Sequence, residues 1–202
     1  MDSRHRPRDS RLIDALEAHA PKPFGGTVWR AVRESRDPAT CSAAGGRWDD
    51  ATFDVLYTAQ ERDGAVAEMH FHLMRGQPIF PSKARYKLYE LNLELDPVLD
   101  LSSADDLTAL GVDMRRFGQL SYEGRGQEYP ATQQIAEAAY FLGFSGLLVP
   151  SARFECVNVI VFCDPAGPAA VEIVRDHGLI DWQQWRESQE LSFRTLAVNS
   201  TA

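Results

Sequence analysis

Apolar residues recur along the chain with two spacings, and together these predict both helices and strands. In residues 132–142 they recur every three or four positions, as in an amphipathic helix. In residues 89–95 a tyrosine and three leucines alternate with polar side chains, as in a half-buried strand. Residues 62–74 fit both spacings, and their content of Ala, Glu, Met and Leu favours a helix.

Signals for the beginning and end of each element complete the assignment. Helices are expected at residues 11–20, 62–74, 103–110, 132–142 and 181–188. Strands are expected at residues 27–32, 55–59, 89–95, 147–149, 157–162 and 191–198. Because the two kinds of element do not alternate regularly, we predict an α+β fold (mixed α/β) with a central mixed sheet flanked by helices. A chain of 202 residues without repeats or linker-like segments is expected to form a single compact domain.

Charge and composition exclude several classes of function. With a net charge of −8, the chain lacks the basic surface that binding to nucleic acid requires. The first residues carry charges without an apolar core, so no secretion signal is expected. The longest apolar runs are far too short to cross a bilayer. We therefore expect a soluble, cytoplasmic protein.

The three cysteines fit neither a zinc site nor a disulfide framework, because their number is odd and no C-x-x-C spacing occurs. Cys156 and Cys163 flank an apolar run and are expected to be small buried side chains. This use of cysteine is typical of a reducing compartment such as the cytosol.

Four short segments carry residues that could take part in chemistry. Arg30 follows a tryptophan on the first predicted strand, and Arg47 lies in a Gly-Gly-Arg-Trp loop. Tyr57 lies on the next strand, Glu68 on the following helix, and Ser151 after a proline between two later strands. Each residue alone has a structural explanation, because arginines often form surface ion pairs and serines are common in turns. Their order along the chain is more informative than any one of them.

In this order the segments resemble the RES domain, a family named for a characteristic Arg, Glu and Ser. The similarity extends over about residues 24–165 and rests on the sequences TVWRAV, GGRWDD, VLYTA, AVAEMHFH, LLVPSAR and VNVIVF. The resemblance implies a fold like that of ADP-ribosyltransferases. It also implies a single RES domain over residues 1–202, with an N-terminal extension at 1–20, a core at about 24–165 and C-terminal elements at 166–202.

The same resemblance implies a function. The chain would be a toxin of a toxin–antitoxin pair that depletes NAD⁺ by cleaving its nicotinamide–ribose N-glycosidic bond, as a glycohydrolase or a phosphorylase. The implied partner is an Xre-like antitoxin that covers the active site, and DNA is contacted only through that antitoxin. No membrane is involved, and self-association into a homo-oligomer stays open. NAD⁺ is the substrate, and neither a bound cofactor nor a metal is expected, because nicotinamide is already a good leaving group.

Residue roles follow from the same match. Catalysis is placed on Glu68, Arg47, Tyr57 and Ser151, and NAD⁺ binding on Arg30, Arg47, Tyr57, Ser151 and Asn158. A guanidinium group suits a diphosphate because it forms two parallel, charge-assisted hydrogen bonds. A carboxylate stabilises the cationic ribose that forms as the glycosidic bond breaks. Tyr57 could stack on the base or orient the ribose, and Ser151 could donate to a phosphate or a ribose hydroxyl.

Two features depart from the family pattern. Asp49 stands where the family often has Asn, which places a negative charge near a site for an anion unless the carboxylate points away. The chain is also long between Glu68 and Ser151, and the extra residues fall around 101–127. They could form a lid, a contact between copies or a contact with the antitoxin.

Three other interpretations stay open. The acceptor of ADP-ribose could be a protein side chain, which would make the chain an ADP-ribosyltransferase. Glu68, His70 and His72 could form a metal site if they shared one face of a strand. In a helix each two-residue step turns the side chain by about 200°, and the three would not converge. The chain could also be an inactive binding module, although the occupied site positions argue against this.

Overall fold

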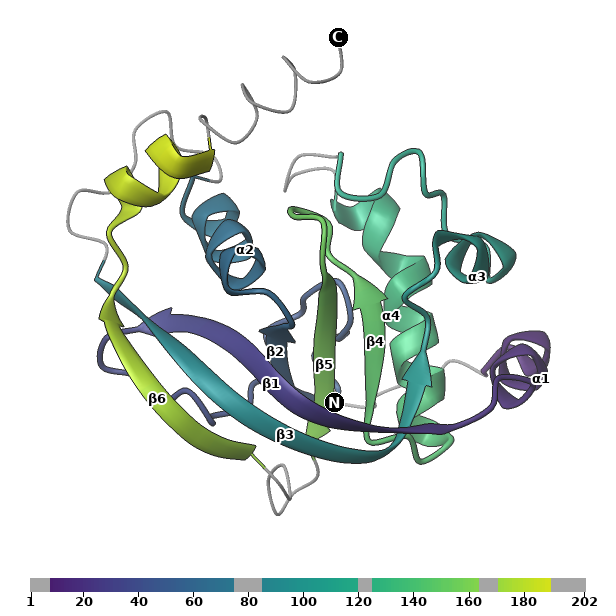
Figure 1. Cartoon of the computed structure of the whole chain (residues 1–202). Coiled ribbons are helices and arrows are strands. Elements are labelled where there is room, and N and C mark those ends of the chain that lie inside the picture. Colours follow the sequence, from purple (N-terminus) through teal and green to yellow (C-terminus); the bar gives the residue numbers. More distant parts are fainter. Residues whose placement is uncertain (1–7, 75–84, 120–124, 164–170, 190–202) are drawn as a thin grey trace, which may run out of the picture.

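A curved six-stranded sheet flanked by helices forms the frame of the protein (Figure 1). The computed structural model describes residues 8–74, 85–119, 125–163 and 171–189. The helices are α1 (Ser10–Glu17), α2 (Arg62–Met74), α3 (Ala104–Ala109) and α4 (Arg125–Phe141), followed by a last helix at residues 182–189. The strands are β1 (Lys22–Arg33), β2 (Asp54–Ala59), β3 (Tyr86–Asp100), β4 (Gly146–Pro150), β5 (Val157–Cys163) and β6 (Val171–Leu179).

The sheet closes on itself through β3. Its strands follow the order β1-β2-β5-β4-β3-β6, and a further pairing between β1 and β3 joins the first five strands into a ring. The pairing of β1 with β3 is antiparallel, from Lys22 opposite Val98 to Arg33 opposite Tyr86, whereas β4 pairs with β3 in parallel. Buried side chains from these strands form one apolar cluster, which includes Val28, Val32, Leu56, Leu91, Leu93, Val159 and Val161.

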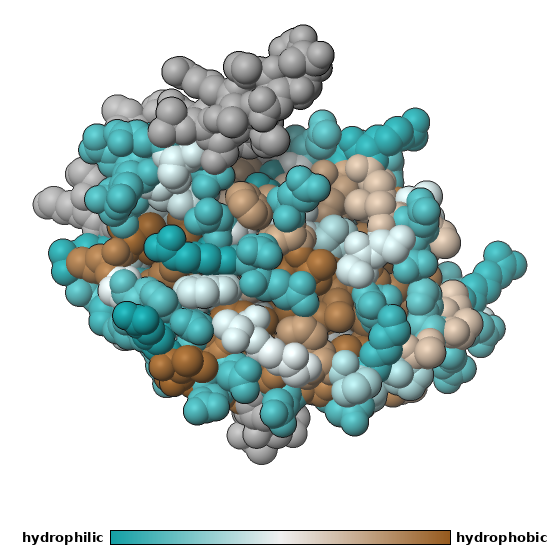
Figure 2. Space-filling view, in the orientation of Figure 1, coloured by the Kyte–Doolittle hydropathy of each residue, from teal (hydrophilic) through white to brown (hydrophobic). Residues whose placement is uncertain are grey.

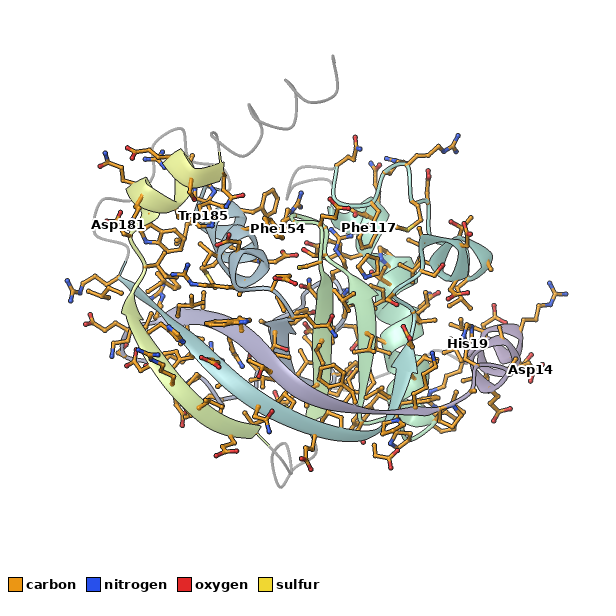
Figure 3. All side chains as sticks on the ribbon, viewed as in Figure 1. Asp14, His19, Phe117, Phe154, Asp181 and Trp185 are labelled. Atoms are coloured by element: carbon orange, nitrogen blue, oxygen red, sulfur yellow. A yellow bond between two sulfur atoms is a disulfide. The ribbon has the colours of Figure 1, made fainter. Side chains whose placement is uncertain are left out.

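Two further apolar clusters attach the helices to the sheet. Helices α1, α3 and α4 pack on β2, β4 and β5 in a cluster that includes Leu16, Leu107 and Ile135. Helix α2 packs on β1 and β2 in a second cluster, which Trp182 of the last helix joins. Figure 3 shows Trp185 of the last helix beside α2, where its ring lies 5.2 Å from the ring of His70. The two clusters include Val55 and Ala59 of β2, which share one face of the strand, so α2 and α4 lie on the same side of β2.

The mixed fold class and most of the predicted elements are confirmed. The segment that fitted two spacings is helix α2, with the expected bounds. Ser103 caps α3, since its side chain accepts a hydrogen bond from the Asp105 N–H at 3.2 Å. Asp181 caps the last helix, since its Oδ1 accepts hydrogen bonds from the N–H groups of Gln183 and Gln184 at 3.1 and 2.9 Å. Local capping signals in the sequence therefore locate these helix starts.

Two elements differ from the sequence-based expectation. Helix α4 begins at Arg125, whereas we expected a helix at residues 132–142. The added turns include Pro130, although proline removes a backbone donor and disfavours a helix interior. Glu128 lies in the added turns, and its ion pair with Arg47 of the loop at residues 41–50 stabilises the longer helix. Strand β6 is not predicted, because most of its residues are exposed and show no apolar alternation. The strand expected at residues 191–198 lies outside the described residues.

The expectation that the cysteines form no disulfide is wrong. Cys41 and Cys163, 122 residues apart, are joined by a disulfide. Pairing of the chain brings them together, because Ser42 bridges Val55 of β2 and the neighbouring Asp54 lies opposite Cys163 of β5. A disulfide that closes a loop of this length contributes about 2–5 kcal/mol to stability. Spacing along the chain carries no sign of the pair.

The third cysteine, Cys156, is a free thiol and is half-buried. Burial, followed by the nearby charge of Glu68, raises its pKa to about 11, so the thiol stays protonated at neutral pH. A protonated thiol is a weak nucleophile. Cys156 is therefore a packing residue, as the sequence predicts.

The surface mixes hydrophilic and hydrophobic side chains, and Figure 2 shows hydrophobic patches between hydrophilic ones. Three large apolar side chains on β6 are exposed: Ile173, Val174 and Leu179. Apolar side chains on an edge strand are typical of surfaces that contact another chain. No helix in the described part of the chain has the length and apolar character needed to span a membrane.

Candidate active site

A cleft of about 630 Å³ opens beside β1 and β2, between the loop at residues 41–50, helix α2 and the connection from β4 to β5. Five of the six predicted site residues line it: Arg30, Arg47, Tyr57, Glu68 and Asn158. The sixth, Ser151, contacts Glu68. The fold thus brings together residues that are far apart in the sequence.

The cleft carries an excess of positive charge on a chain whose net charge is −8. Its described lining includes five arginines, Arg30, Arg33, Arg36, Arg47 and Arg153, and two carboxylates, Asp49 and Glu68. Like charges repel one another, so such a grouping costs stability unless an anion compensates it. Guanidinium groups bind phosphate oxygens especially well, because their planar donors match the anion. The cleft is therefore suited to a ligand with phosphate groups.

Glu68 projects from α2 and is anchored by two neutral donors. Ser151 Oγ donates a hydrogen bond to Glu68 Oε1 at 2.8 Å, and Asn158 Nδ2 donates to the same oxygen at 3.1 Å. Gly64 allows α2 to approach the sheet this closely, because a Cβ at this position would lie 2.4 Å from the Cys156 sulfur. The three side chains form one network, in which the orientation of the carboxylate is fixed.

Arg30 is buried in the wall of the cleft, with 9% of its surface exposed. Its Nη2 donates to the Thr40 carbonyl at 3.1 Å. Burial, together with the nearby charge of Arg36, lowers the pKa of Arg30 to about 10, so the group stays charged at neutral pH. Within the described residues, Arg30 Nη1 and Asn158 Oδ1 are buried without a hydrogen-bond partner. Such atoms cost about 1–3 kcal/mol each, so both are positions where a ligand would be stabilised.

The Gly-Gly-Arg-Trp loop is folded around Asp49, which is fully buried. The carboxylate accepts hydrogen bonds from the N–H groups of Gly45 and Gly46 at 2.6 and 2.7 Å and from the Tyr57 hydroxyl at 2.9 Å. A Cβ on Gly46 would lie 2.4 Å from that hydroxyl, so this position requires glycine. The Asp49 carboxylate is thus bound by donors of the loop and of Tyr57, so its oxygens point to these groups.

Tyr57 holds this loop through its hydroxyl. The hydroxyl accepts a hydrogen bond from the Trp48 N–H at 2.9 Å while it donates to Asp49. Burial, and then the charge of Asp49, raise the pKa of Tyr57 well above its ordinary value, so the hydroxyl remains protonated at neutral pH. The ring lines the cleft and remains a candidate for contact with a ligand.

Replacement of Tyr57 by Phe is expected to lower the free energy of unfolding by about 1–3 kcal/mol, because it leaves the Trp48 N–H without its acceptor and removes one donor from the Asp49 carboxylate. Urea denaturation of the two proteins measures the change. Tyr140→Phe is the matched control, since Tyr140 is 36% exposed. Equal losses in the two variants would contradict a structural role for the Tyr57 hydroxyl.

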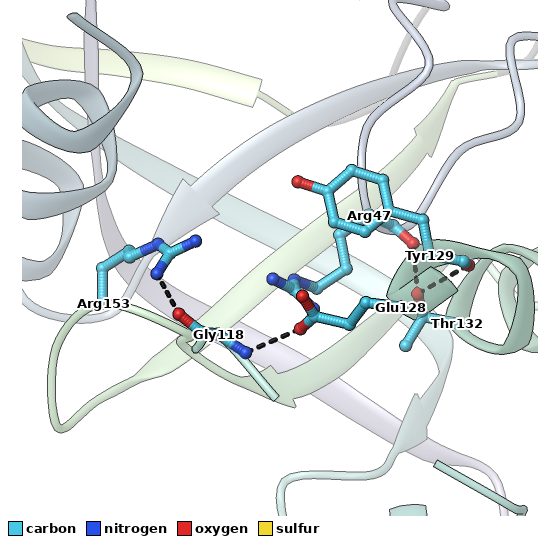
Figure 4. Close-up of polar contacts among 6 residues, drawn as sticks. All are labelled: Arg47, Gly118, Glu128, Tyr129, Thr132 and Arg153. Atoms are coloured by element: carbon cyan, nitrogen blue, oxygen red, sulfur yellow. Dashed lines mark hydrogen bonds and ion pairs between the residues drawn. The ribbon is translucent and has the colours of Figure 1, made fainter. Parts of the chain in front are cut away.

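The guanidinium group of Arg47 is already paired within the protein, whereas the sequence suggests a group that is free to bind a diphosphate. Its Nη1 forms a buried ion pair with Glu128 of α4, and the two side chains are 9% and 5% exposed. Its guanidinium carbon lies 4.4 Å from the centre of the Phe117 ring and 5.0 Å from that of Tyr129. Glu128 also accepts a hydrogen bond from the Gly118 N–H at 2.6 Å (Figure 4). Arg47 is therefore fixed in place by the segment that follows α3.

Helix α4 also holds the backbone of the loop. Thr132 Oγ1 donates to the Arg47 carbonyl at 2.7 Å. Gln133 Nε2 donates to the carbonyls of Gly46 and Asp49 at 2.8 and 3.0 Å. Through these contacts α4 supports one wall of the cleft.

A comparison with known protein families agrees with the family that the order of the motifs suggests. Residues 27–186 match the RES domain. The chain belongs to the RES domain family. Relatives include the NAD(+) phosphorylase MbcT of Mycobacterium tuberculosis and that of Mycobacterium bovis, each 24% identical over 150 residues, which cover 71% of this chain and 77% of the relative.

A solved structure shows that the fold is shared. The crystal structure of the M. tuberculosis MbcT–MbcA toxin–antitoxin complex superposes with a TM-score of 0.70 at 22% identity, covering 89% of this chain and 97% of the other. The predicted membership of the RES family is confirmed. The match also confirms the predicted mixed fold.

The interpretation of Glu68, His70 and His72 as metal ligands required a strand, whereas this RES domain has a helix there. Glu68 and His72 line the cleft, but His70 packs beside Trp185. Within the described residues no three His, Cys, Asp or Glu side chains are grouped so that they could hold a metal ion.

Two charged residues at this site have no role assigned from the sequence, Arg153 in the lining of the RES domain cleft and Glu128 behind Arg47. Glu128 is 81 positions from Arg47, and nothing in its local sequence distinguishes it from a solvated helix residue. Arg153 follows Ser151 closely, yet a charged residue in a loop is usually exposed. In the structure its guanidinium carbon lies 3.3 Å from the centre of the Phe71 ring, and its Nη1 donates to the Gly118 carbonyl (Figure 4).

Proposed function

We propose that this RES domain cleaves the N-glycosidic bond between nicotinamide and ribose in NAD⁺ and transfers ADP-ribose to water or phosphate. The observation that carries the proposal is the position of Glu68, a carboxylate fixed in a cleft that is otherwise rich in arginine. The relatives named NAD(+) phosphorylase support the choice of substrate.

Glu68 would act on the ribose. When the glycosidic bond breaks, its electron pair leaves with the nicotinamide nitrogen and the ribose becomes cationic. Within the described residues both hydrogen bonds to the carboxylate fall on Oε1, so Oε2 is the oxygen that can approach the sugar. A fixed negative charge beside the developing cation lowers the barrier, as the second carboxylate does in glycosidases. Nicotinamide leaves as a neutral molecule, so the step needs no strong acid, resident cofactor or metal.

Arg30 would hold the diphosphate. Its Nη1 is a buried donor that a phosphate oxygen could satisfy, and its Nη2 is anchored to Thr40. A charge-assisted hydrogen bond of this kind is about twice as strong as a neutral one. Asn158 Oδ1 could accept a hydrogen bond from a ribose hydroxyl while its amide holds Glu68. Binding and catalysis would then share one network.

The biological role belongs to the same proposal. A chain that consumes NAD⁺ would act as a toxin in the cytoplasm, where the cell's own NAD⁺ is used. An antitoxin that covers the cleft would restrain it, in line with the complex in which the structural relative is found. Contact with DNA would come only through that antitoxin, since this chain is acidic.

The test is to incubate the purified chain with NAD⁺ and to follow nicotinamide release by chromatography, with and without inorganic phosphate. We expect nicotinamide together with ADP-ribose or its 1-phosphate. A labelled-NAD⁺ reaction with cell extract checks for transfer to protein, and labelled protein as the main product would replace the proposed acceptor. The absence of nicotinamide under every condition would reject the function.

A further inference from the structure

Four of the five arginines in the cleft lining form two groups. Arg30 and Arg36 both donate to the Thr40 carbonyl, at 3.1 and 3.4 Å. Arg47 and Arg153 are linked through Gly118, whose N–H binds the partner of Arg47 and whose carbonyl accepts from Arg153. A single diphosphate that is held by the first group leaves the second available for another anion.

Arg153 is the member of the second group that is open to the cleft. Whereas Arg47 is paired with Glu128 and nine-tenths buried, Arg153 is half-buried and lines the cleft. Phe71 covers one face of its guanidinium group, and the Gly118 carbonyl binds Nη1. These contacts hold the side chain in one orientation while other N–H groups remain to donate, because a guanidinium group has five N–H donors.

The position of Arg153 places it within electrostatic range of Glu68. Burial lowers the pKa of Arg153, the charge of Glu68 raises it, and the charge of Arg47 lowers it again. Within the described residues no direct ion pair joins Arg153 to Glu68, although both line the same cleft. An anion bound to Arg153 would therefore lie close to the sugar that Glu68 contacts.

We propose that Arg153 binds the acceptor phosphate and so selects phosphate over water, an inference that rests on the proposed cleavage of NAD⁺. One phosphate oxygen forms the bond to the anomeric carbon as the bond to nicotinamide breaks and its electron pair leaves with the nitrogen. The products are nicotinamide and ADP-ribose 1-phosphate, and the remaining phosphate proton goes to solvent. The diphosphate of NAD⁺ stays with Arg30.

The test compares the parent chain with Arg153→Gln, which removes the charge, and Arg153→Lys, which keeps the charge but loses the planar fork. Arg115→Gln is the matched control, since its side chain is 92% exposed and lies outside the cleft lining. Nicotinamide release is measured against phosphate at saturating NAD⁺ and against NAD⁺ at saturating phosphate. Thermal unfolding checks that each variant is folded.

We expect Arg153→Gln to raise KM for phosphate by about 10- to 100-fold, the loss of one charge-assisted hydrogen bond, and to leave KM for NAD⁺ within about twofold. Arg153→Lys, which retains the charge, is expected to raise KM for phosphate less. A rise in KM for NAD⁺ alone would assign Arg153 to the diphosphate and overturn the proposal. An unchanged KM for phosphate would also overturn it.

A second measurement separates this inference from the proposed function. Inorganic phosphate is titrated calorimetrically into the parent chain and into Arg153→Gln in the absence of NAD⁺. Binding to the parent chain that is lost in the variant supports the site even if no NAD⁺ is cleaved. Equal binding to both proteins, or no binding to the parent, rejects the site even if NAD⁺ is cleaved.

Discussion

Replacing Glu68 by Gln is expected to lower kcat for nicotinamide release by about 100- to 1,000-fold, the range found when one group that stabilises transition-state charge is removed. Glutamine keeps the shape of the side chain and an oxygen that can accept from Ser151 and Asn158, so the fold and the network should persist. Only the negative charge beside the ribose is lost. The measurement is the steady-state rate of nicotinamide release, with thermal unfolding as the check on folding.

The control for this variant is Glu155→Gln. Glu155 lies in the same connection as Ser151 and is exposed, and it does not line the cleft. The Glu155→Gln substitution also removes one negative charge near the site but outside the cleft lining, so a rate close to that of the parent chain is expected. A Glu68→Gln protein that releases nicotinamide as fast as the parent would remove Glu68 from the mechanism.

Replacing Glu128 by Ala is expected to lower the free energy of unfolding by about 3–5 kcal/mol, the cost of leaving one buried charge without its partner. Arg47 would remain nine-tenths buried and charged, and the Gly118 N–H would lose its acceptor. Urea denaturation followed by circular dichroism measures the change. The effect is large because burial makes the removal of one partner more costly than the absence of both.

Glu137→Ala provides the comparison on the same helix. Glu137 pairs with Arg8, but these two side chains are 27% and 29% exposed, so the loss should be below about 1 kcal/mol. A similar loss in both variants would show that the burial of the Arg47–Glu128 pair contributes nothing. The double variant Glu128→Ala/Arg47→Met, which removes both charges, should recover part of the stability.

The sequence predicts elements well where the cause is local. The helix at α2 follows from residue propensities, and the caps at Ser103 and Asp181 follow from side chains that bind the next few N–H groups. Strand β6 could not be predicted from local signals, because it is stabilised by pairing with β3 and not by an apolar face of its own. The disulfide could not be predicted either, since β2 and β5 must pair before Cys41 meets Cys163.

For the candidate site, the sequence predicts which residues take part but not which partners they bind. The ordered motifs point to Arg30, Tyr57 and Glu68, and the fold brings these residues to one cleft. The motifs carry no information on what each side chain binds. Arg47 is bound by Glu128 of α4, and that partner could be found only from the folded chain.

Gly118, one of the extra residues between Glu68 and Ser151, contacts both Glu128 and Arg153. Its φ of +74° and its close approach to Ala152, where a Cβ would lie 2.5 Å from the carbonyl oxygen, leave room for glycine alone. Gly118 thus joins the Arg47–Glu128 pair to the connection between β4 and β5. A natural variant that lacked Gly118 would lose the contacts that hold Arg153 and the Arg47–Glu128 pair in the cleft wall. Among natural variants, a deletion here should therefore occur together with substitutions at Arg47, Glu128 and Arg153.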